Sequence, residues 1–166
     1  MKIYYVDGST RGKNQKGAEN TGGFGVVQFY DEDENFIQWH KSEQCENTTN
    51  NREELKGLIA ALEHCDYYYP DEKCIIYCDS AYVVNMFNEW IFSWSRNGWK
   101  NSKKVTVENL DLVLELWEFA QRGWPHYQVN KTDGHVGVVG NELADALATD
   151  SYIKFKRIIQ EEGISI

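Results

Sequence analysis

The chain has 166 residues, of which 42% are hydrophobic and 14% aromatic, a length and composition that suit one domain with a sizeable core. Its formal net charge of −9 argues, taken alone, against a nucleic-acid ligand, because binding a polyanion usually requires a basic surface. No apolar run approaches the roughly 18 residues of a membrane span, and the start MKIYYVDGST does not resemble a signal peptide.

The cysteines form no recognisable metal or redox motif. No CxxC pair occurs, and the spacing matches no zinc site. We therefore expect Cys45, Cys65, Cys74 and Cys78 to be free, buried thiols. Free thiols are typical of a reducing compartment, so we expect a cytoplasmic protein without membrane contact.

The N-terminal part predicts a strand, a hairpin and a helix. KIYYVDGS is a short β-rich run that ends in a turn signal, and a polar, Gly-rich loop follows it. FGVVQFYDEDENFIQWHKSEQ predicts two strands joined by an acidic turn. From Arg52 to about Asp66, apolar residues at 55, 58, 59 and 62 predict an amphipathic helix.

The C-terminal part predicts two more strands among helices. KCIIYCDS is typical of a strand buried on both faces, and AYVVNMFNEWI suits a short helix. LDLVLELWEFAQRG predicts a helix that stops at Gly123, and HYQVNKTDGHVGVVG predicts a strand and a loop. One final helix, with Asn141 as its N-cap, is expected to follow. This order indicates an α/β domain with a mixed sheet and right-handed crossovers.

Two aspartates are expected at one edge of that sheet. Asp7 ends the first strand and Asp79 ends the fourth. If these strands are parallel neighbours, both carboxylates lie at their carboxyl ends, where open α/β sheets bind ligands. A divalent cation such as Mg²⁺ would keep two adjacent carboxylates ionised. Each aspartate by itself also fits a turn residue or a helix cap.

Two further acids fit the same place. Asp145 lies among alanines and leucines at the start of the last helix, where burying a charge is costly without an electrostatic partner. On the helix that begins near Arg52, the periodicity places Glu54 at the edge of the buried face and Glu53 in solvent. We therefore expect Glu54 to face the site and Glu53 to be an ordinary first-turn acid that the helix dipole favours. Such a set of four carboxylates can hold two Mg²⁺ ions.

The negative charge is unevenly distributed. No acid occurs between Glu89 and Glu108, and this segment interleaves tryptophans with Arg96, Lys100, Lys103 and Lys104. A locally basic surface on an acidic domain is therefore compatible with the sequence.

The sequence resembles type 1 ribonuclease H. The matching pieces occur in the family's order over nearly the whole chain: VDGS (6–9), TNNREEL (49–55), YCDSAYV (77–83), WSRNGWK (94–100) and GHVGVVGNELAD (134–145). The short VDGS piece is a weak signal, whereas the asparagine–arginine–glutamate and GNELAD pieces are specific.

The resemblance implies a ribonuclease H-like fold, with a five-stranded mixed sheet flanked by helices. It implies Mg²⁺-dependent hydrolysis of the RNA strand in RNA–DNA hybrids, giving 3′-hydroxyl and 5′-phosphate ends, with Mn²⁺ as a substitute ion. The family's catalytic carboxylates fall on Asp7, Glu54, Asp79 and Asp145, with Gly8 beside the metals. Its catalytic-loop histidine, expected to assist proton transfer or product release, falls on His135; by itself it would be taken for a surface residue.

The resemblance also assigns substrate contacts. Asn50 and Asn51 carry both donors and acceptors, which suit the 2′-hydroxyls that distinguish RNA from DNA, although one of them could instead cap the helix. Thr49 is expected to grip a DNA phosphate. Trp90 is expected to pack on deoxyribose, and the remaining contacts are expected from Ser80, Trp99, Arg96, Lys100, Lys103 and Lys104.

Some features depart from the family or stay open. Ala81 stands where many bacterial relatives carry an RNA-touching glutamine, and the phosphate-binding asparagine cannot be placed on Asn14 or Asn20. We expect one domain over residues 1–166, with a core of 1–152 and a helical extension of 153–166. We expect a monomer with no obligatory protein partner and low processivity. The alternatives are a DNA-processing nuclease or integrase of the same superfamily, or a catalytically silent hybrid-binding module.

Overall fold

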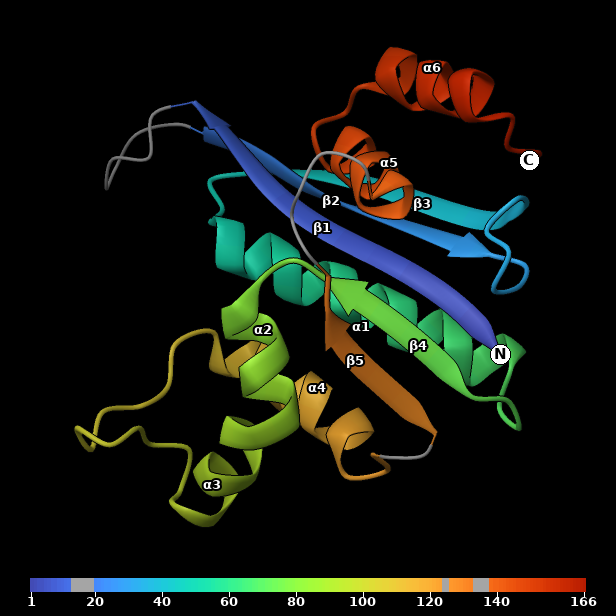
Figure 1. Ribbon diagram of the computed structural model, residues 1–166. Coiled ribbons are helices and arrows are strands. Elements are labelled where there is room, and N and C mark those ends of the chain that lie inside the picture. The colour runs from blue at the N-terminus through green and yellow to red at the C-terminus, as the bar shows by residue number, and fades with distance from the viewer. Residues whose placement is uncertain (13–19, 124–125, 133–137) are drawn as a thin grey trace.

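A five-stranded mixed sheet with the order β3-β2-β1-β4-β5 forms the centre of the fold (Figure 1). The computed structural model describes residues 1–12, 20–123, 126–132 and 138–166. β1 is antiparallel to β2, β2 is antiparallel to β3, and β1, β4 and β5 are parallel. The strands are β1 (Lys2–Gly12), β2 (Asn20–Phe29), β3 (Ile37–Glu46), β4 (Cys74–Cys78) and β5 (Tyr127–Lys131).

Helices cover both faces of the sheet (Figure 1). One face carries α1, α2, η1, α3 and α4, and the other carries α5 and α6. None of the helices in the described ranges is long and apolar enough to cross a lipid bilayer. The helices are α1 (Asn50–Tyr68), α2 (Ala81–Asn85), the π-helix η1 (Met86–Trp90), α3 (Ile91–Arg96), α4 (Leu110–Ala120), α5 (Val139–Ala148) and α6 (Tyr152–Glu162).

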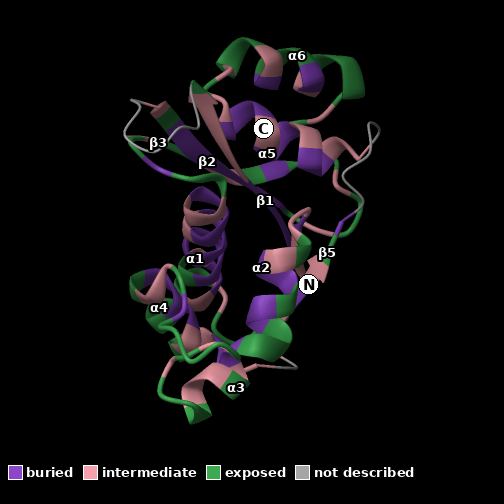
Figure 2. Cartoon of the chain, turned by 90° about the vertical axis from the view of Figure 1, so that its left-hand side faces the viewer, coloured by how far each residue is buried: buried purple, intermediate pink, exposed green. Residues whose placement is uncertain are grey.

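Strand β1 separates two hydrophobic cores. Because successive side chains of a strand point to opposite faces, Tyr4 and Val6 pack in the core with α1, whereas Ile3 and Tyr5 pack in the core with α5. Figure 2 shows buried residues along the faces of α1 and α5 that meet the sheet. Strand β1 is thus buried on both faces, as its continuous apolar run predicts.

The predicted mixed sheet, the hairpin and the order of the strands are confirmed, but the first strand ends later than predicted. β1 continues to Gly12, so Asp7 lies within the strand and not at its end. The pairing of β1 with β4 does stop at Val6 and Cys78, so Asp7 is the first residue of β1 beyond its parallel neighbour. Asp7 thus lies at the predicted edge of the parallel part of the sheet because β4 ends there, although β1 itself continues.

The single C-terminal helix predicted from the sequence is wrong, because two helices form there. Asp150 adopts a left-handed backbone with φ of 57°, and the Ser151 hydroxyl accepts a hydrogen bond from the Lys154 amide to begin α6. Asn141 is not an N-cap, because α5 begins after Val138 and Asn141 is buried inside it. The Asp-Ser pair within the apolar pattern was the overlooked signal.

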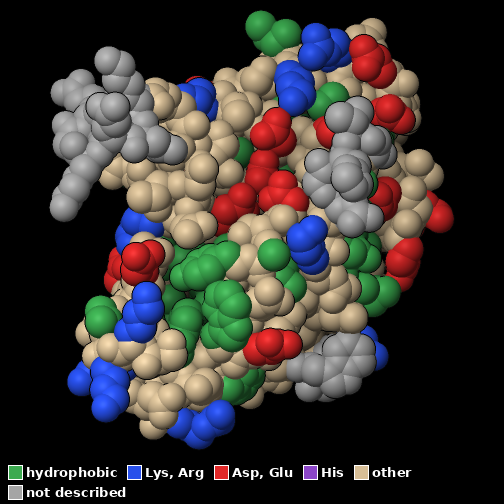
Figure 3. Space-filling view, turned by 60° about the vertical axis from the view of Figure 1, so that its left-hand side comes forward, with side chains coloured by type: hydrophobic (Ala, Val, Ile, Leu, Met, Phe, Trp, Pro, Cys, Tyr) green, Lys and Arg blue, Asp and Glu red, His purple; other side chains and the backbone are tan. Residues whose placement is uncertain are grey.

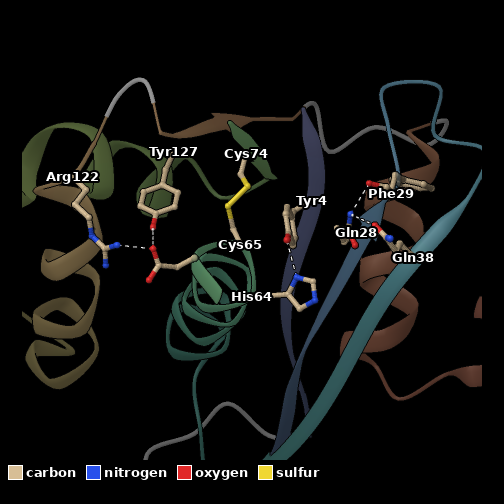
Figure 4. The surroundings of a disulfide bond; sticks show 10 residues. Tyr4, Gln28, Phe29, Gln38, His64, Cys65, Cys74, Arg122 and Tyr127 are labelled. Carbon is tan, nitrogen blue, oxygen red and sulfur yellow. Dashed lines mark hydrogen bonds and ion pairs between the residues drawn. A yellow bond between two sulfur atoms is a disulfide. The ribbon is translucent and has the colours of Figure 1, made fainter. Parts of the chain in front are cut away.

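The expectation of four free thiols is wrong for two of them. A disulfide joins Cys65 near the end of α1 to Cys74 at the start of β4, and both residues are fully buried (Figure 4). Cys45 and Cys78 are free. Cys65 and Cys74 are nine residues apart, and their proximity depends on the turn that returns the chain from α1 to the sheet.

Polar contacts surround this disulfide (Figure 4). His64 Nδ1 and the Tyr4 hydroxyl are hydrogen-bonded at 2.7 Å, and the His64 ring stacks on Trp39. Asp66 accepts hydrogen bonds from Arg122 and from the Tyr127 hydroxyl. These contacts tie the end of α1 to β1, β5 and the end of α4.

Opening the disulfide should destabilise the fold without changing its architecture. A cross-link that closes a loop of about ten residues restricts the unfolded chain and is worth about 2–3 kcal/mol. Urea unfolding with dithiothreitol should show this loss. A double variant, Cys65→Ala with Cys74→Ala, should be equally destabilised and indifferent to reductant; no difference between oxidised and fully reduced protein would contradict the prediction.

Candidate active site

Carboxylates gather around the end of β4, where the pairing of β1 with β4 stops. Figure 3 shows acidic side chains grouped together on one face of the molecule. Asp7 of β1 is 5% exposed and Glu54 of α1 is 7% exposed. The carboxyls of Glu54, Asp79 and Asp145 lie close enough to Asp7 to take part in shifting its pKa or to have their own pKa shifted by it. The structure therefore brings together the four acids predicted from the sequence, with Asp7 at their centre.

Two glycines allow the helices to approach this point. A Cβ on Gly8 would lie 2.3 Å from the backbone nitrogen of Glu54, so only a glycine lets the start of α1 lie against β1. Gly25 pairs with Asp7 across β1 and β2, and a Cβ there would lie 2.2 Å from the backbone oxygen of Ala144. The first glycine admits Glu54 and the second admits the turn of α5 that carries Asp145.

The buried acids favour their protonated forms when no cation is bound. Desolvation, followed by the charges of Glu54 and Asp79, raises the pKa of Asp7 to about 10. Desolvation and the charge of Asp79 raise the pKa of Glu54 to about 7. Burial also raises the pKa of Asp79. Such crowding of like charges is relieved by protons or by a cation.

Glu54 is held by its neighbours. The backbone N–H of Gly8 donates to its carboxylate. The buried thiol of Cys78 donates to Glu54 Oε2 at a distance of 3.4 Å. Burial, together with the charge of Glu54, raises the pKa of that thiol well above its usual value, so it stays a donor. Gly8 thus positions an acid through its backbone, and its predicted place beside metals stays a prediction.

The chemistry of this donor set fits a hard divalent cation. Carboxylate oxygens are the preferred ligands of Mg²⁺. Ligand atoms of Glu54, Asp79 and Cys78 lie within 4.8 Å of one another. The remaining oxygens come from Asp7 and Asp145, and a cation bound between them would remove the repulsion that raises these pKa values.

The prediction that Glu53 faces solvent is wrong. Glu53 is fully buried, and its Oε2 accepts from the Thr48 hydroxyl at 2.7 Å and from Lys56 Nζ at 2.8 Å. The periodicity of α1 did not reveal this, because the chain just before α1 folds over the first turn and covers it. Asn20 fixes that chain, since its amide both donates to and accepts from the backbone of Thr48, each at 2.9 Å.

The residues predicted to distinguish RNA from DNA lie at the exposed start of α1. Thr49 is the N-cap, because its hydroxyl oxygen accepts from the Arg52 amide at 3.1 Å, so neither asparagine serves as the cap. Asn50 is exposed and accepts a hydrogen bond from the Thr10 hydroxyl at 2.8 Å. Asn51 is half-buried beside it. Both asparagines lie within four residues of Glu54.

Arg52 braces this helix start against α4. Its Nη1 and Nη2 atoms donate to the two carboxylate oxygens of Asp111 at 3.0 and 2.8 Å. Nη1 also donates to Asn109 Oδ1 at 3.3 Å, and Asn109 precedes α4. The guanidinium thus connects the asparagine pair to the end of the basic segment.

The basic segment forms an exposed arm after α3. The side chains of Arg96, Lys100, Lys103 and Lys104 are all exposed. Figure 3 shows Lys and Arg side chains beside hydrophobic side chains on the lower part of the face. A cavity of about 390 Å³ in this arm is lined by Trp90, Ser93, Trp94, Asn97, Lys100, Asn101 and Ser102.

The tryptophans of the arm differ in burial. Trp90 is 36% exposed and makes an edge contact with Tyr82. Trp99 instead packs against the hydrophobic core and makes an edge contact with Trp117 of α4. The geometry therefore favours Trp90 as a contact residue and gives Trp99 a supporting place. Both predicted contacts remain untested by the structure.

The other predicted site residues are placed as follows. Ser80 follows Asp79 and caps α2, because its hydroxyl oxygen accepts from the Val83 amide at 3.2 Å. His135 lies outside the described residues. One residue near the acids was not anticipated, since Lys154 of α6 forms an ion pair with Asp145. No periodicity or motif in the sequence indicated that pairing.

Comparisons with known proteins agree with the fold. The family model described as RNase H matches residues 1–153. Ribonuclease H of Symbiobacterium thermophilum is 40% identical over 152 residues, covering 88% of this chain and 90% of that protein. LC9-RNase H1, a type 1 RNase H with the type 2 active-site motif, has a TM-score of 0.71 and 30% identity, covering 90% of this chain and 71% of that chain. The PFV RNase H domain matches in fold with a TM-score of 0.76 at 24% identity, covering 92% of this chain and 94% of that domain.

Replacing Glu53 by glutamine should lower the free energy of unfolding by about 1–3 kcal/mol, because a buried carboxylate that bonds to Thr48 and Lys56 loses its charge. Glu63→Gln makes the same chemical change on an exposed face of α1 and should be nearly neutral. Urea unfolding of both variants checks this. Equal stability of the two would mean that the contacts of Glu53 contribute nothing.

Asp7→Asn should stabilise the cation-free protein and flatten its pH dependence. The pKa of Asp7 is raised, so the native state keeps a proton that the unfolded state has released above pH about 4. Stability therefore falls as pH rises toward about 10, by at most about 1.4 kcal/mol per pH unit for one proton.

Urea unfolding in the presence of a chelator should show this fall in the free energy of unfolding between pH about 7 and about 8.5. His64 does not interfere there, because burial lowers its pKa to about 4 and its contribution is complete above its ordinary value. Wild type should lose stability across the range and Asp7→Asn should lose less. Parallel curves for the two proteins would refute the assignment.

Proposed function

Because the chain belongs to the ribonuclease H family, we propose that it hydrolyses the RNA strand of RNA–DNA hybrids, leaving 3′-hydroxyl and 5′-phosphate ends. The observation that carries this proposal is the convergence of Asp7, Glu54, Asp79 and Asp145 from four separate elements. Their mutual repulsion has no structural benefit, and it suits a site built to take up divalent cations.

We propose that these four carboxylates hold two Mg²⁺ ions, for which Mn²⁺ would substitute. Bound ions would supply activation of a water molecule and stabilisation of the leaving oxygen. Asp7 interacts with all three of the other acids, Glu54, Asp79 and Asp145, so it would serve as the shared ligand. Glu54 is held rigidly by Gly8 and Cys78, which would fix the ligand geometry.

The start of α1 would read the substrate. Asn50 and Asn51 can each donate to and accept from a 2′-hydroxyl, a group that DNA lacks. Thr49 would contact a phosphate of the DNA strand. Arg52 and Glu53 hold this segment from two sides, through Asp111 and Thr48. Discrimination of the sugar and ligation of the metal would therefore depend on one helix start.

The basic arm would bind the DNA strand. Four exposed cations, namely Arg96, Lys100, Lys103 and Lys104, would neutralise phosphates, and the exposed edge of Trp90 would pack on deoxyribose. Trp99 supports the arm from the core side. This arrangement explains how a chain with a net charge of −9 can bind a polyanion. We propose that Ser80 contacts the substrate next to Asp79.

Other expectations stay predictions. His135 is proposed to assist proton transfer or product release near the scissile phosphate. We also propose that the protein is a cytoplasmic monomer without an obligatory protein partner, and that it forms one domain with a core of 1–152 and an extension of 153–166.

Labelled RNA–DNA, RNA–RNA and DNA–DNA duplexes, offered with Mg²⁺, test the proposal. The enzyme should cut only the RNA strand of the hybrid. Asp79→Asn should reduce cleavage to background because a metal ligand is lost. Asp71→Asn makes the same change at an exposed position before β4, at the opposite end of that strand from Asp79, and should leave cleavage intact.

Two outcomes would overturn the proposal. Cleavage of the DNA duplex would favour a DNA-processing nuclease of the same superfamily. Binding of the hybrid without cleavage of any duplex would favour a silent binding module.

A further inference from the structure

A lysine from the C-terminal helix pairs with one of the four acids. Lys154 Nζ lies 3.0 Å from Asp145 Oδ2, and the two side chains are 37% and 39% exposed. Lys154 lies one residue beyond the part of the chain that the family model matches. The pairing joins helix α6 to the first of the two C-terminal helices, α5.

The position of Lys154 is firmly held. The Ser151 amide donates to the Ala146 carbonyl at 2.8 Å, and the Thr149 hydroxyl donates to the Asp145 carbonyl at 2.9 Å. These bonds fold the chain back so that α6 begins beside Asp145. The next residue, Phe155, is fully buried in the core shared with α5. The first turn of α6 is thus anchored on both sides of Lys154.

Helix stability does not explain a lysine at this place. The N-terminus of a helix carries partial positive charge, so a cation in the first turn is unfavourable. The first turn of α6 contains no acidic residue to compensate. The charge that offsets Lys154 is Asp145, on a different helix, and the pairing therefore depends on the acidic site.

The lysine charge faces the cluster from its more open side. Asp145 is much more exposed than Asp7 and Glu54, and it belongs to the cluster because it raises the pKa of both Asp7 and Asp79. Lys131, at the end of β5, acts on the same cluster by lowering the pKa of Asp79. Lys154 differs from Lys131 because its ammonium group forms a direct ion pair with Asp145, one of the acids proposed to hold the cation.

We propose that Lys154 is a positioning residue that holds Asp145 in the cation-free protein and competes with the divalent cation for it. The ammonium group neutralises Asp145 until the cation arrives and then gives up Oδ2. It thereby weakens cation binding at this side of the site. This inference rests on the proposed function, because it requires the four acids to bind a divalent cation.

Cation binding without nucleic acid tests the inference. Lys154→Met removes the charge and keeps an unbranched apolar chain. Its affinity for divalent cations should rise about two- to fivefold, the range that a partly exposed ion pair supports. Electron paramagnetic resonance measures Mn²⁺ binding and calorimetry measures Mg²⁺ binding. The gain should shrink as salt is raised. Lys154→Arg keeps the charge and should bind cations as wild type does.

Lys156→Met is the matched control, since it makes the same change in net charge on an exposed position of α6. It should leave cation affinity unchanged, and urea midpoints should show that all variants fold. If Lys154→Met binds cations no more tightly than Lys156→Met does, the role proposed for Lys154 is wrong, whereas the proposed metal site is unaffected. A wild-type protein that binds no divalent cation would overturn this inference and the proposed metal site together.

Discussion

The structure depends on one electrostatic constraint, the repulsion among four carboxylates around the buried side chain of Asp7. Desolvation and the neighbouring charges raise the pKa of Asp7 to about 10 and that of Glu54 to about 7. The negative charges of the cluster are therefore balanced by bound protons, by the ion pair with Lys154, or by a bound cation. This constraint makes the same residues unfavourable for stability and suitable for metal-dependent chemistry.

The fold is arranged to maintain this constraint. β4 ends one residue before Asp79, which leaves Asp7 without a parallel neighbour. Gly8 and Gly25 let α1 and α5 approach the two sides of this position more closely than any side chain would permit. Sheet topology and two missing Cβ atoms together determine the site, and neither would be sufficient alone.

The surroundings of α1 and α6 adapt the site in this particular chain. Glu53, beside the candidate metal ligand Glu54, is buried and holds the preceding loop through Thr48. Arg52 connects the same helix start to α4. On the other face of the sheet, α6 brings Lys154 to Asp145. Side chains beside the four acids and the asparagine pair thus contact and hold both groups.

The sequence by itself determined which four acids converge, because the ends of apolar strands and the starts of amphipathic helices are visible as local patterns. It also indicated the mixed sheet and the basic segment. Tertiary structure decided the burial of Glu53, the disulfide between Cys65 and Cys74, the break before α6 and the pairing of Lys154. These features arise from contacts between segments that fold over one another, and a helix period describes one segment at a time.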